Sequence, residues 1–291
     1  MDQEKMNIQW YPGHMTKTRR QIEADLKLVD AGCEIVDARI PMSSRNPDID
    51  AICGSKPRII VLNRMDLADP EATKRWAAYF RSKGMAVVIT DCKTRKGITD
   101  FVPAARSVLK EKLERDAAGG MHRPVKVMVV GIPNVGKSTL INQISGRKGA
   151  KAENRPGVTR GKQWVSVDAG LQLLDTPGIL WPKFEDPEVG MMLAYTGAVK
   201  EGVIDLEELA CRLMELLHKF YPQTLLERYK VEAEAGTPGW ELMELAGRKR
   251  GYLVSGGEVN TERMAKVLVD EFRSGKLGKF TLEMPEEEDH G

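Results

Sequence analysis

The sequence predicts an α/β fold, in which a doubly wound, mostly parallel six-stranded sheet is followed by an all-helical C-terminal region. Three observations support this fold class. Six short runs are rich in β-branched and apolar residues, helical patterns separate most of them, and the strand signal fades after about residue 185. Several of the runs are apolar nearly throughout, as expected of strands that helices cover on both faces.

The expected elements alternate along the first part of the chain. The two runs nearest residue 170 are joined by Ala169-Gly170 and predict a hairpin at one edge of the sheet. We expect strands at 33–39, 58–64, 85–91, 126–132, 163–168 and 171–176, and helices at 16–30, 70–83, 98–115 and 137–146.

The C-terminal third predicts helices only. Residues 205–220 and 260–272 carry apolar side chains at helical spacing, and Asn260 fits the N-cap of the second helix. We therefore divide the chain into an α/β domain at 1–185 and a small helical domain at 190–291.

Composition excludes several classes of protein. The chain has 291 residues and is 42% hydrophobic and 30% charged, which is typical of a globular protein with a buried core. Its apolar runs are too short to cross a bilayer, and the N-terminal MDQEKMNIQW lacks the apolar stretch of a signal peptide. We therefore expect a cytoplasmic protein with no membrane partner. The four cysteines form no CxxC pair, which favours free thiols over a zinc site.

The run GIPNVGKST, residues 131–139, follows an expected strand and precedes an expected helix. It fits the P-loop pattern G-x-x-x-x-G-K-[ST], whose backbone N–H groups wrap a β-phosphate at a helix N-terminus. Lys137 would neutralise the β- and γ-phosphate oxygens, and the Ser138 hydroxyl would hold Mg²⁺. The expected phosphate-binding residues are Asn134, Val135, Gly136, Lys137, Ser138 and Thr139.

Two further segments predict contacts to the γ-phosphate and its metal ion. In LLDTPG, residues 173–178, Asp175 would hold the Mg²⁺ shell through water, and the Gly178 N–H would meet the γ-phosphate. In RPGVT, residues 155–159, Thr159 offers the hydroxyl for a second Mg²⁺ contact, on a loop that the γ-phosphate could order.

Guanine recognition is predicted by VLNRMD, residues 61–66, which ends a strand and is similar to the N-K-x-D motif. Asn63 would fix the loop, and the Asp66 carboxylate would accept both N1–H and the N2 amine of guanine, a donor pair that adenine lacks. Arg64 replaces the usual lysine and would cover the base, while Met65 completes the base-binding motif.

A second base loop is predicted at DCKTRKG, residues 91–97, which fits the pattern S-A-K-x-G-x-G. The backbone of Cys92 and Lys93 would contact the guanine oxygen. Asp91 stands where serine is usual, which is a second departure from the pattern.

The motif order predicts a circularly permuted P-loop GTPase domain, because the base motifs at 63–97 precede the phosphate motifs at 131–178. As a result of the permutation, the segment after DTPG is followed directly by the helical domain. In this order the motifs resemble the circularly permuted GTPases of ribosome assembly, and most nearly the bacterial YlqF type. The motifs that carry the resemblance are WYPGHM, NRMD, GIPNVGKST, PGVT and DTPG.

The resemblance implies a cytoplasmic factor that binds precursors of the 50S ribosomal subunit, made of rRNA and ribosomal proteins. It also implies hydrolysis of GTP to GDP and phosphate late in their assembly. Two alternatives stay open: an RNA-binding assembly chaperone for which the nucleotide is only a ligand, and a GTPase of small-subunit or tRNA maturation. DNA is not an expected partner.

The resemblance also indicates His14 of WYPGHM as the catalytic residue, within an N-terminal catalytic segment at 1–20. Ras-type enzymes orient water with a glutamine after the DxxG motif, whereas Ile179 and Leu180 stand here and cannot bind water. An imidazole near neutrality could hold the water and take up a proton.

Asn134 also indicates a K⁺ site. The asparagine of a P-N-V-G-K-S loop can ligate K⁺ beside the β- and γ-phosphates. The expected cofactors are therefore Mg²⁺ and K⁺. Basic segments predict RNA contacts through phosphates: residues 147–163 hold six basic side chains against one acid, and 247–252 read GRKRGY. We accordingly expect the helical domain to bind rRNA and the ribosome.

Overall fold

The computed structural model of the chain describes residue 20 and residues 22–121, 123–146, 163–168, 170–176, 186–199 and 204–285. A six-stranded sheet lies at its centre, with the strands in the order β3-β2-β1-β4-β6-β5. The pairs β1–β2, β1–β4, β2–β3 and β4–β6 are parallel, and the edge pair β5–β6 is antiparallel. The predicted sheet and its edge hairpin are therefore confirmed. The strands are β1 (Ala31–Asp37), β2 (Arg58–Asn63), β3 (Ala86–Ile89), β4 (Val125–Gly131), β5 (Gln163–Asp168) and β6 (Leu171–Asp175).

Helices cover both faces of the sheet because successive strand residues point to opposite sides. Ile35 of β1 packs in the same core as α4 (Phe101–Val108) and α6 (Lys137–Ser145). The adjacent Val36 packs in a separate core with α3 (Pro70–Ser82), which contributes Trp76 and Phe80. The short helix α2 (Ile49–Cys53) and residues 22–26 cover a third apolar cluster on β4 and β6.

The sequence predicted one continuous helix at 98–115, and this prediction is wrong because the segment is divided into separate helices. A 3₁₀ turn (Ile98–Asp100) leads into α4, and α5 (Lys110–Ala118) follows after a break at Leu109, whose φ is −107° and ψ is 10°. Leu109 is buried, whereas α5 contains no buried residue. Packing against the core therefore fixes the direction of α4. Helix α5 makes no such packing contact, so nothing in the core holds it on the axis of α4. The expected helix at 16–30 lies partly outside the described residues and is helical at 22–26.

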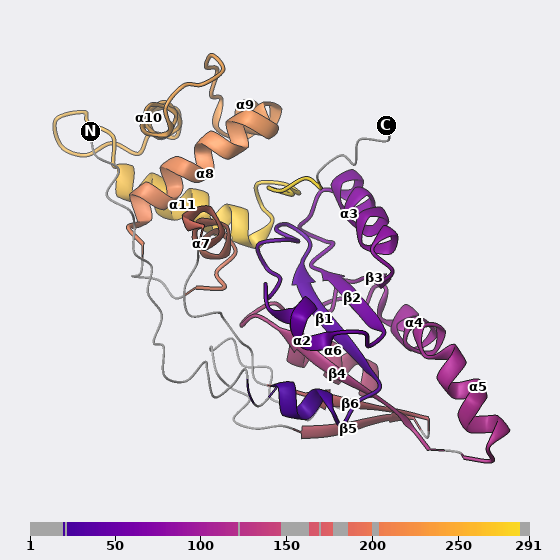
Figure 1. The fold of residues 1–291 in the computed structure, drawn as a ribbon. Helices are drawn as coiled ribbons and strands as arrows, with labels where there is room; N and C mark the ends of the chain where they lie inside the picture. The colour runs from indigo at the N-terminus through magenta and orange to yellow at the C-terminus, as the bar shows by residue number, and fades with distance from the viewer. Residues whose placement is uncertain are drawn as a thin grey trace.

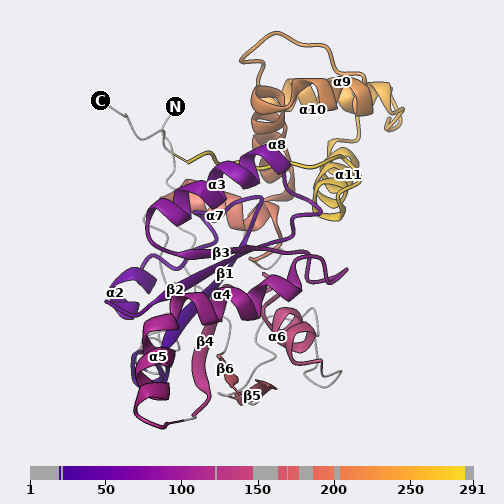
Figure 2. The same cartoon turned by 90° about the vertical axis from the view of Figure 1, so that its right-hand side faces the viewer.

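The C-terminal third is helical, as predicted. It contains α7 (Pro187–Tyr195), α8 (Leu206–Phe220), α9 (Pro222–Tyr229), α10 (Gly239–Lys249) and α11 (Thr261–Ser274). Helices α8, α9 and α10 gather at the upper end of the view, and α11 lies below them at about the height of α3 (Figure 2). Asp205 caps α8 by accepting the N–H of Glu208 at 2.9 Å, and Asn260 caps α11 by accepting that of Arg263 at 2.9 Å.

After α11 the chain returns to the sheet as a short extended segment, residues 279–283, which we call the C-terminal strap (Figure 1). The Phe280 N–H donates to the Leu67 carbonyl at 2.9 Å, and the Leu282 N–H donates to the Arg39 carbonyl at 2.8 Å. The indole of Trp76 on α3 donates to the Glu283 carbonyl at 2.9 Å. The strap therefore ties the loops after β1 and β2 to the C-terminal helices.

Among the described residues, no helix combines the length and the apolar composition that a bilayer span requires.

Candidate nucleotide site

The carboxyl ends of the parallel strands bring the predicted motifs to one edge of the sheet, where open α/β sheets bind their ligands. The loop at 63–66 follows β2, the loop at 90–97 follows β3, and the loop at 132–136 joins β4 to α6. In the sheet order β3 is next to β2, and only β1 lies between β2 and β4, so the three loops start from the same part of the sheet edge although they are far apart in sequence.

The P-loop is a tight turn between β4 and α6. Gly136 has a φ of 104°, and a Cβ at this position would lie 2.4 Å from Nδ2 of Asn63. Only glycine combines this backbone conformation with so close an approach. Lys137 begins α6, and its side chain is 6% exposed. The N-terminus of α6 thus faces the site with a buried lysine beside it.

The carboxamide of Asn63 connects the three loops. Its Nδ2 donates to the Val135 carbonyl in the P-loop at 2.7 Å. Its Oδ1 accepts the N–H of Cys92 at 3.1 Å and the hydroxyl of Thr90 at 3.2 Å. Asn63 itself is buried, so these bonds replace water for both ends of its amide.

The second base loop is stabilised by Asp91, the residue that departs from the usual serine. Its Oδ1 accepts the N–H groups of Lys93 at 2.8 Å and Thr94 at 3.3 Å, and Oδ2 accepts the Thr94 hydroxyl. Burial acts to raise the pKa of Asp91, but these hydrogen bonds outweigh it and the pKa lies below its ordinary value. Burial raises the pKa of the Cys92 thiol to about 11, so this loop presents its backbone and not a thiolate.

Arg64, the other departure, belongs to the first base loop and reaches from there to the P-loop. Its backbone is left-handed with a φ of 64°, and its Nη2 donates to the Asn134 carbonyl at 3.1 Å. Its Nε lies 3.7 Å from Oδ2 of Asp37 at the end of β1. A lysine, with a single nitrogen, lacks this two-sided reach.

Asp37 and Arg39 form a buried ion pair that sequence analysis missed. Arg39 donates to both carboxylate oxygens of Asp37, from Nε at 2.9 Å and Nη2 at 2.7 Å. Burial acts to raise the pKa of Asp37, but the charges of Arg39 and Arg64 outweigh it and lower the pKa. Two opposite charges at the end of a buried strand, in the run DAR, were the available signal.

Lys137 is paired with Asp175 at the end of β6, and both side chains are buried. Burial lowers the pKa of Lys137 below its ordinary value, against the opposing charge of Asp175. The half-buried Ser138 hydroxyl follows directly on α6. A hydroxyl and a carboxylate next to a phosphate-binding turn are the oxygen ligands that Mg²⁺ uses in such sites, so these residues fit the ion.

The remaining predicted site residues differ in their exposure, and three of them are not described by the structure. Asp66 and Lys93 are exposed, while Met65 and Thr139 are half-buried; the Met65 N–H donates to the Thr90 carbonyl at 3.1 Å. His14, Thr159 and Gly178 lie outside the described residues.

The fold, the P-loop and the position of the base motifs before it define this chain as a circularly permuted P-loop GTPase. A family model described as 50S ribosome-binding GTPase matches residues 126–232. The ribosome biogenesis GTPase A of Bacillus cereus is 46% identical over 283 residues, which cover 97% of this chain and 95% of that protein. The chain belongs to the ribosome biogenesis GTPase A family.

More distant relatives and solved structures agree. The mitochondrial ribosome-associated GTPase 1 of Mus musculus is 33% identical, over 94% of this chain and 89% of that protein. The GDP-bound structure of TM YlqF is 30% identical with a TM-score of 0.65, over 92% of this chain and 100% of that one. The GNP-bound YlqF from T. maritima has a TM-score of 0.60 at 30% identity, over 93% and 99%. The chain is therefore an enzyme that hydrolyses GTP, and GTPases of this kind typically use Mg²⁺.

Replacing Gly136 by alanine should weaken GTP binding. The added Cβ collides with the Asn63 amide, which is bonded on both sides and cannot withdraw. We expect GTP affinity to fall by more than about tenfold, which corresponds to about 1.4 kcal/mol. Calorimetric titration with GTP measures this change.

Gly146→Ala is the matched control. Gly146 is also left-handed, with a φ of 66°, but a Cβ there meets nothing within 4 Å. This variant should lose roughly 1 kcal/mol of stability and keep its affinity for GTP. Equal affinities of Gly136→Ala and wild type would contradict the described packing of the P-loop.

Proposed function

We propose that this chain is a GTPase of late 50S assembly, which binds rRNA-containing precursors in the cytoplasm and hydrolyses GTP when the ribosome stimulates it. The observation that carries the proposal is that Asn63 joins both base loops to the P-loop, an arrangement suited to a guanine nucleotide. The relatives' names add the ribosomal context, since they are called ribosome biogenesis GTPase A.

In this proposal residues 1–185 form the GTPase domain, with the catalytic segment at 1–20, and residues 190–291 form the ribosome-binding domain. The helical domain carries exposed basic side chains suited to phosphate contacts, and such contacts supply affinity with little sequence specificity. They are Arg248, Lys249, Arg263 and Lys266.

Nucleotide binding exchanges the partner of Lys137. The lysine would leave Asp175 for the β- and γ-phosphate oxygens, and Asp175 would then face the Mg²⁺ shell together with Ser138 and Thr159. When bound, Mg²⁺ neutralises charge on the phosphate oxygens. The Gly178 N–H would meet the γ-phosphate, so GTP and GDP would leave Asp175 and the segment after it in different surroundings.

Base recognition falls to the exposed Asp66 carboxylate, with Arg64 and Met65 beside the base and the backbone of Cys92 and Lys93 on its oxygen. Asn134 would supply a K⁺ ligand next to the phosphates. Such an ion adds positive charge where other GTPases use an arginine finger.

Asp66→Asn should change the preferred base from guanine to xanthine. The amide cannot accept both N1–H and N2–H of guanine, but it can donate to the 2-oxo group of xanthine. Loss of a hydrogen bond to a charged group costs about 1.5–3 kcal/mol, so we expect GTP affinity to fall roughly 10- to 100-fold while XTP affinity rises.

The control for this change is Asp69→Asn. Asp69 lies three residues further on and caps α3 by accepting the Glu71 N–H at 2.8 Å, a role that asparagine also fills. Titrations with GTP and XTP should leave this variant unchanged. An Asp66→Asn variant that still prefers GTP by the wild-type ratio would show that the exposed carboxylate does not read the base.

His14→Ala should remove hydrolysis that depends on the ribosome while leaving GTP affinity intact. A residue that positions water and transfers a proton contributes on the order of 10²- to 10⁴-fold to a rate, so we expect a loss of that size with 50S subunits. Single-turnover GTP hydrolysis with and without 50S and 30S subunits measures it.

His218→Ala serves as the histidine control, since His218 bonds the Ala233 carbonyl in the helical domain at 3.2 Å. Normal 50S-stimulated hydrolysis by His14→Ala would overturn the assignment of His14. Loss of hydrolysis with normal completion of particles would favour the assembly-chaperone alternative. Stimulation by 30S subunits alone would favour a role in small-subunit maturation.

A further inference from the structure

The C-terminal end of α7 lies against the P-loop and is held there by a residue of α11. Helix α7 ends at Tyr195 and is closed by Gly197, which is left-handed with a φ of 78°. The Gly197 N–H donates to the Ala194 carbonyl at 3.1 Å, and the Ala198 N–H donates to the Leu193 carbonyl at 2.9 Å. This pair of bonds is a Schellman cap, which fixes the direction of the Gly197 carbonyl.

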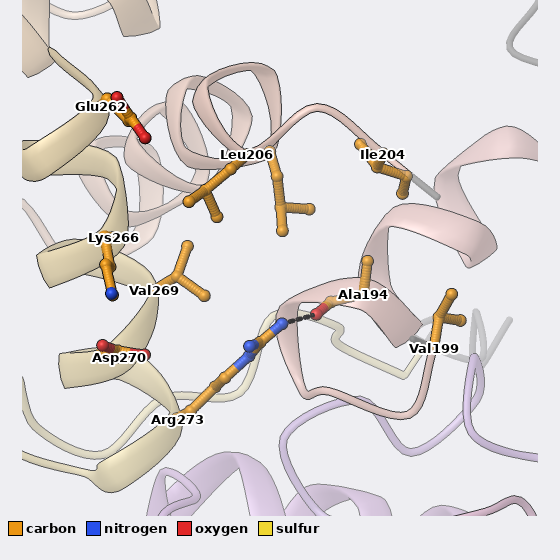
Figure 3. Close-up of a pocket in the computed structure, with 10 residues that line it drawn as sticks. Ala194, Val199, Ile204, Leu206, Glu262, Lys266, Val269, Asp270 and Arg273 are labelled. Carbon is orange, nitrogen blue, oxygen red and sulfur yellow. Dashed lines mark hydrogen bonds between the residues drawn. The ribbon is translucent and has the colours of Figure 1, made fainter. Parts of the chain in front are cut away.

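Arg273 of α11 braces this cap. Its Nη2 donates to the Ala194 carbonyl at 2.8 Å and its Nε donates to the Tyr195 carbonyl at 3.1 Å. Figure 3 shows the side chain reaching from α11 to the end of α7, beside a cavity of about 280 Å³. A Cβ on Gly197 would come within 3.6 Å of Nε, so the guanidinium lies directly on the turn. A positive charge at a helix C-terminus also stabilises the helix dipole.

The Gly197 carbonyl in turn binds the P-loop. It accepts Nδ2 of Asn134 at 3.2 Å, while the Asn134 backbone carbonyl accepts Nη2 of Arg64 at 3.1 Å. Asn134 is left-handed, with a φ of 62°. An amide whose nitrogen is held directs its oxygen to the opposite side, where the oxygen is an acceptor for a cation. Gly197 thereby fixes which side of the Asn134 amide presents its oxygen.

We propose that Arg273 is a positioning residue of the nucleotide site, which acts through the cap of α7 to orient the side chain of Asn134. Helices α7 and α11 thus hold one side chain of the P-loop in place, although neither helix belongs to the sheet or to its loops. The part of this proposal that concerns K⁺ rests on the proposed function, in which Asn134 is the ion's ligand. The contact chain from Arg273 to Gly197 to Asn134 does not depend on that role.

A double-mutant cycle between Arg273 and Asn134 tests the proposal. The full chain is prepared as wild type, Arg273→Gln, Asn134→Ala and the double variant, and the Kd for a non-hydrolysable GTP analogue is measured in KCl and in NaCl. Residues in one hydrogen-bond network couple, so the effects of the two substitutions on affinity should not add. We expect Arg273→Gln to raise the Kd about fivefold in KCl when Asn134 is present, and less than about twofold in the Asn134→Ala background.

Two further variants separate positioning from general stability. Arg273→Lys keeps the charge and one donor to the α7 carbonyls, so it should recover part of the affinity. Arg228→Gln is the matched control, since Arg228 binds Glu271 of α11 through Nε at 2.9 Å and, among the described residues, makes no hydrogen bond or ion pair with α7 or the P-loop. Its Kd should equal that of wild type, even where its thermal unfolding midpoint falls.

The outcomes distinguish the two proposals. Additive effects of Arg273→Gln and Asn134→Ala, or an equal effect of Arg228→Gln, would overturn the positioning role, and Arg273→Lys supplies the same cycle if the glutamine variant does not fold. Equal wild-type affinities and hydrolysis rates in KCl and NaCl would overturn the K⁺ role of Asn134. A non-additive cycle would support the positioning role in either case.

Discussion

The carboxamide of Asn63 is the interaction on which the nucleotide site depends. One end of the amide holds the P-loop, and the other end holds the loop after β3. Because the amide is buried, its removal would leave the Val135 carbonyl and the Cys92 N–H without these partners, at a cost of about 1–3 kcal/mol each. The same close approach requires glycine at position 136. The geometry of the site is thus set by contacts between loops and not by the order in which the chain visits them.

This explains why the permuted order is compatible with a GTPase site. Val135 lies 72 residues after Asn63 in the chain, yet their atoms are 2.7 Å apart. Permutation moves the chain ends and leaves the sheet order that brings these loops together. Its consequence is that the C-terminal third now flanks the site on two sides. The cap of α7 contacts the P-loop, and the C-terminal strap binds Leu67, directly after the base motif.

The sequence predicted the sheet well because its four inner strands, β1, β2, β4 and β6, are mostly apolar and buried runs. Residues such as Val127, Val129 and Leu173 leave no other location for these segments than a buried sheet. The P-loop and base motifs could also be predicted from the sequence, because their short turns require glycine and amide residues at fixed spacing. The break at Leu109 was not readable, since helical periodicity continues through it and only the loss of core contacts ends the axis.

Long-range polar contacts were the main features that the sequence did not reveal. The pairing of Arg39 with Asp37, the contact of Glu283 with the backbone of Met42 and the brace from Arg273 to α7 each depend on tertiary approach. The departures at Arg64 and Asp91 became intelligible only with their partners visible. Arg64 reaches Asn134 and Asp37, and Asp91 accepts the hydrogen bonds that order its own loop. The assignments of His14, Thr159 and Gly178 stay predictions from sequence, because these residues lie outside the described part of the chain.

The affinity of Asn63 variants for GTP, measured by calorimetric titration beside their unfolding midpoints, tests the central claim most directly. Asn63→Asp keeps the acceptor for Cys92 and loses the donor to Val135, whereas Asn63→Ala loses both. The account predicts that GTP affinity falls in the order wild type, Asn63→Asp, Asn63→Ala, with a total loss on the order of 100-fold in proteins that remain folded. A folded Asn63→Ala variant that binds GTP with wild-type affinity would contradict it.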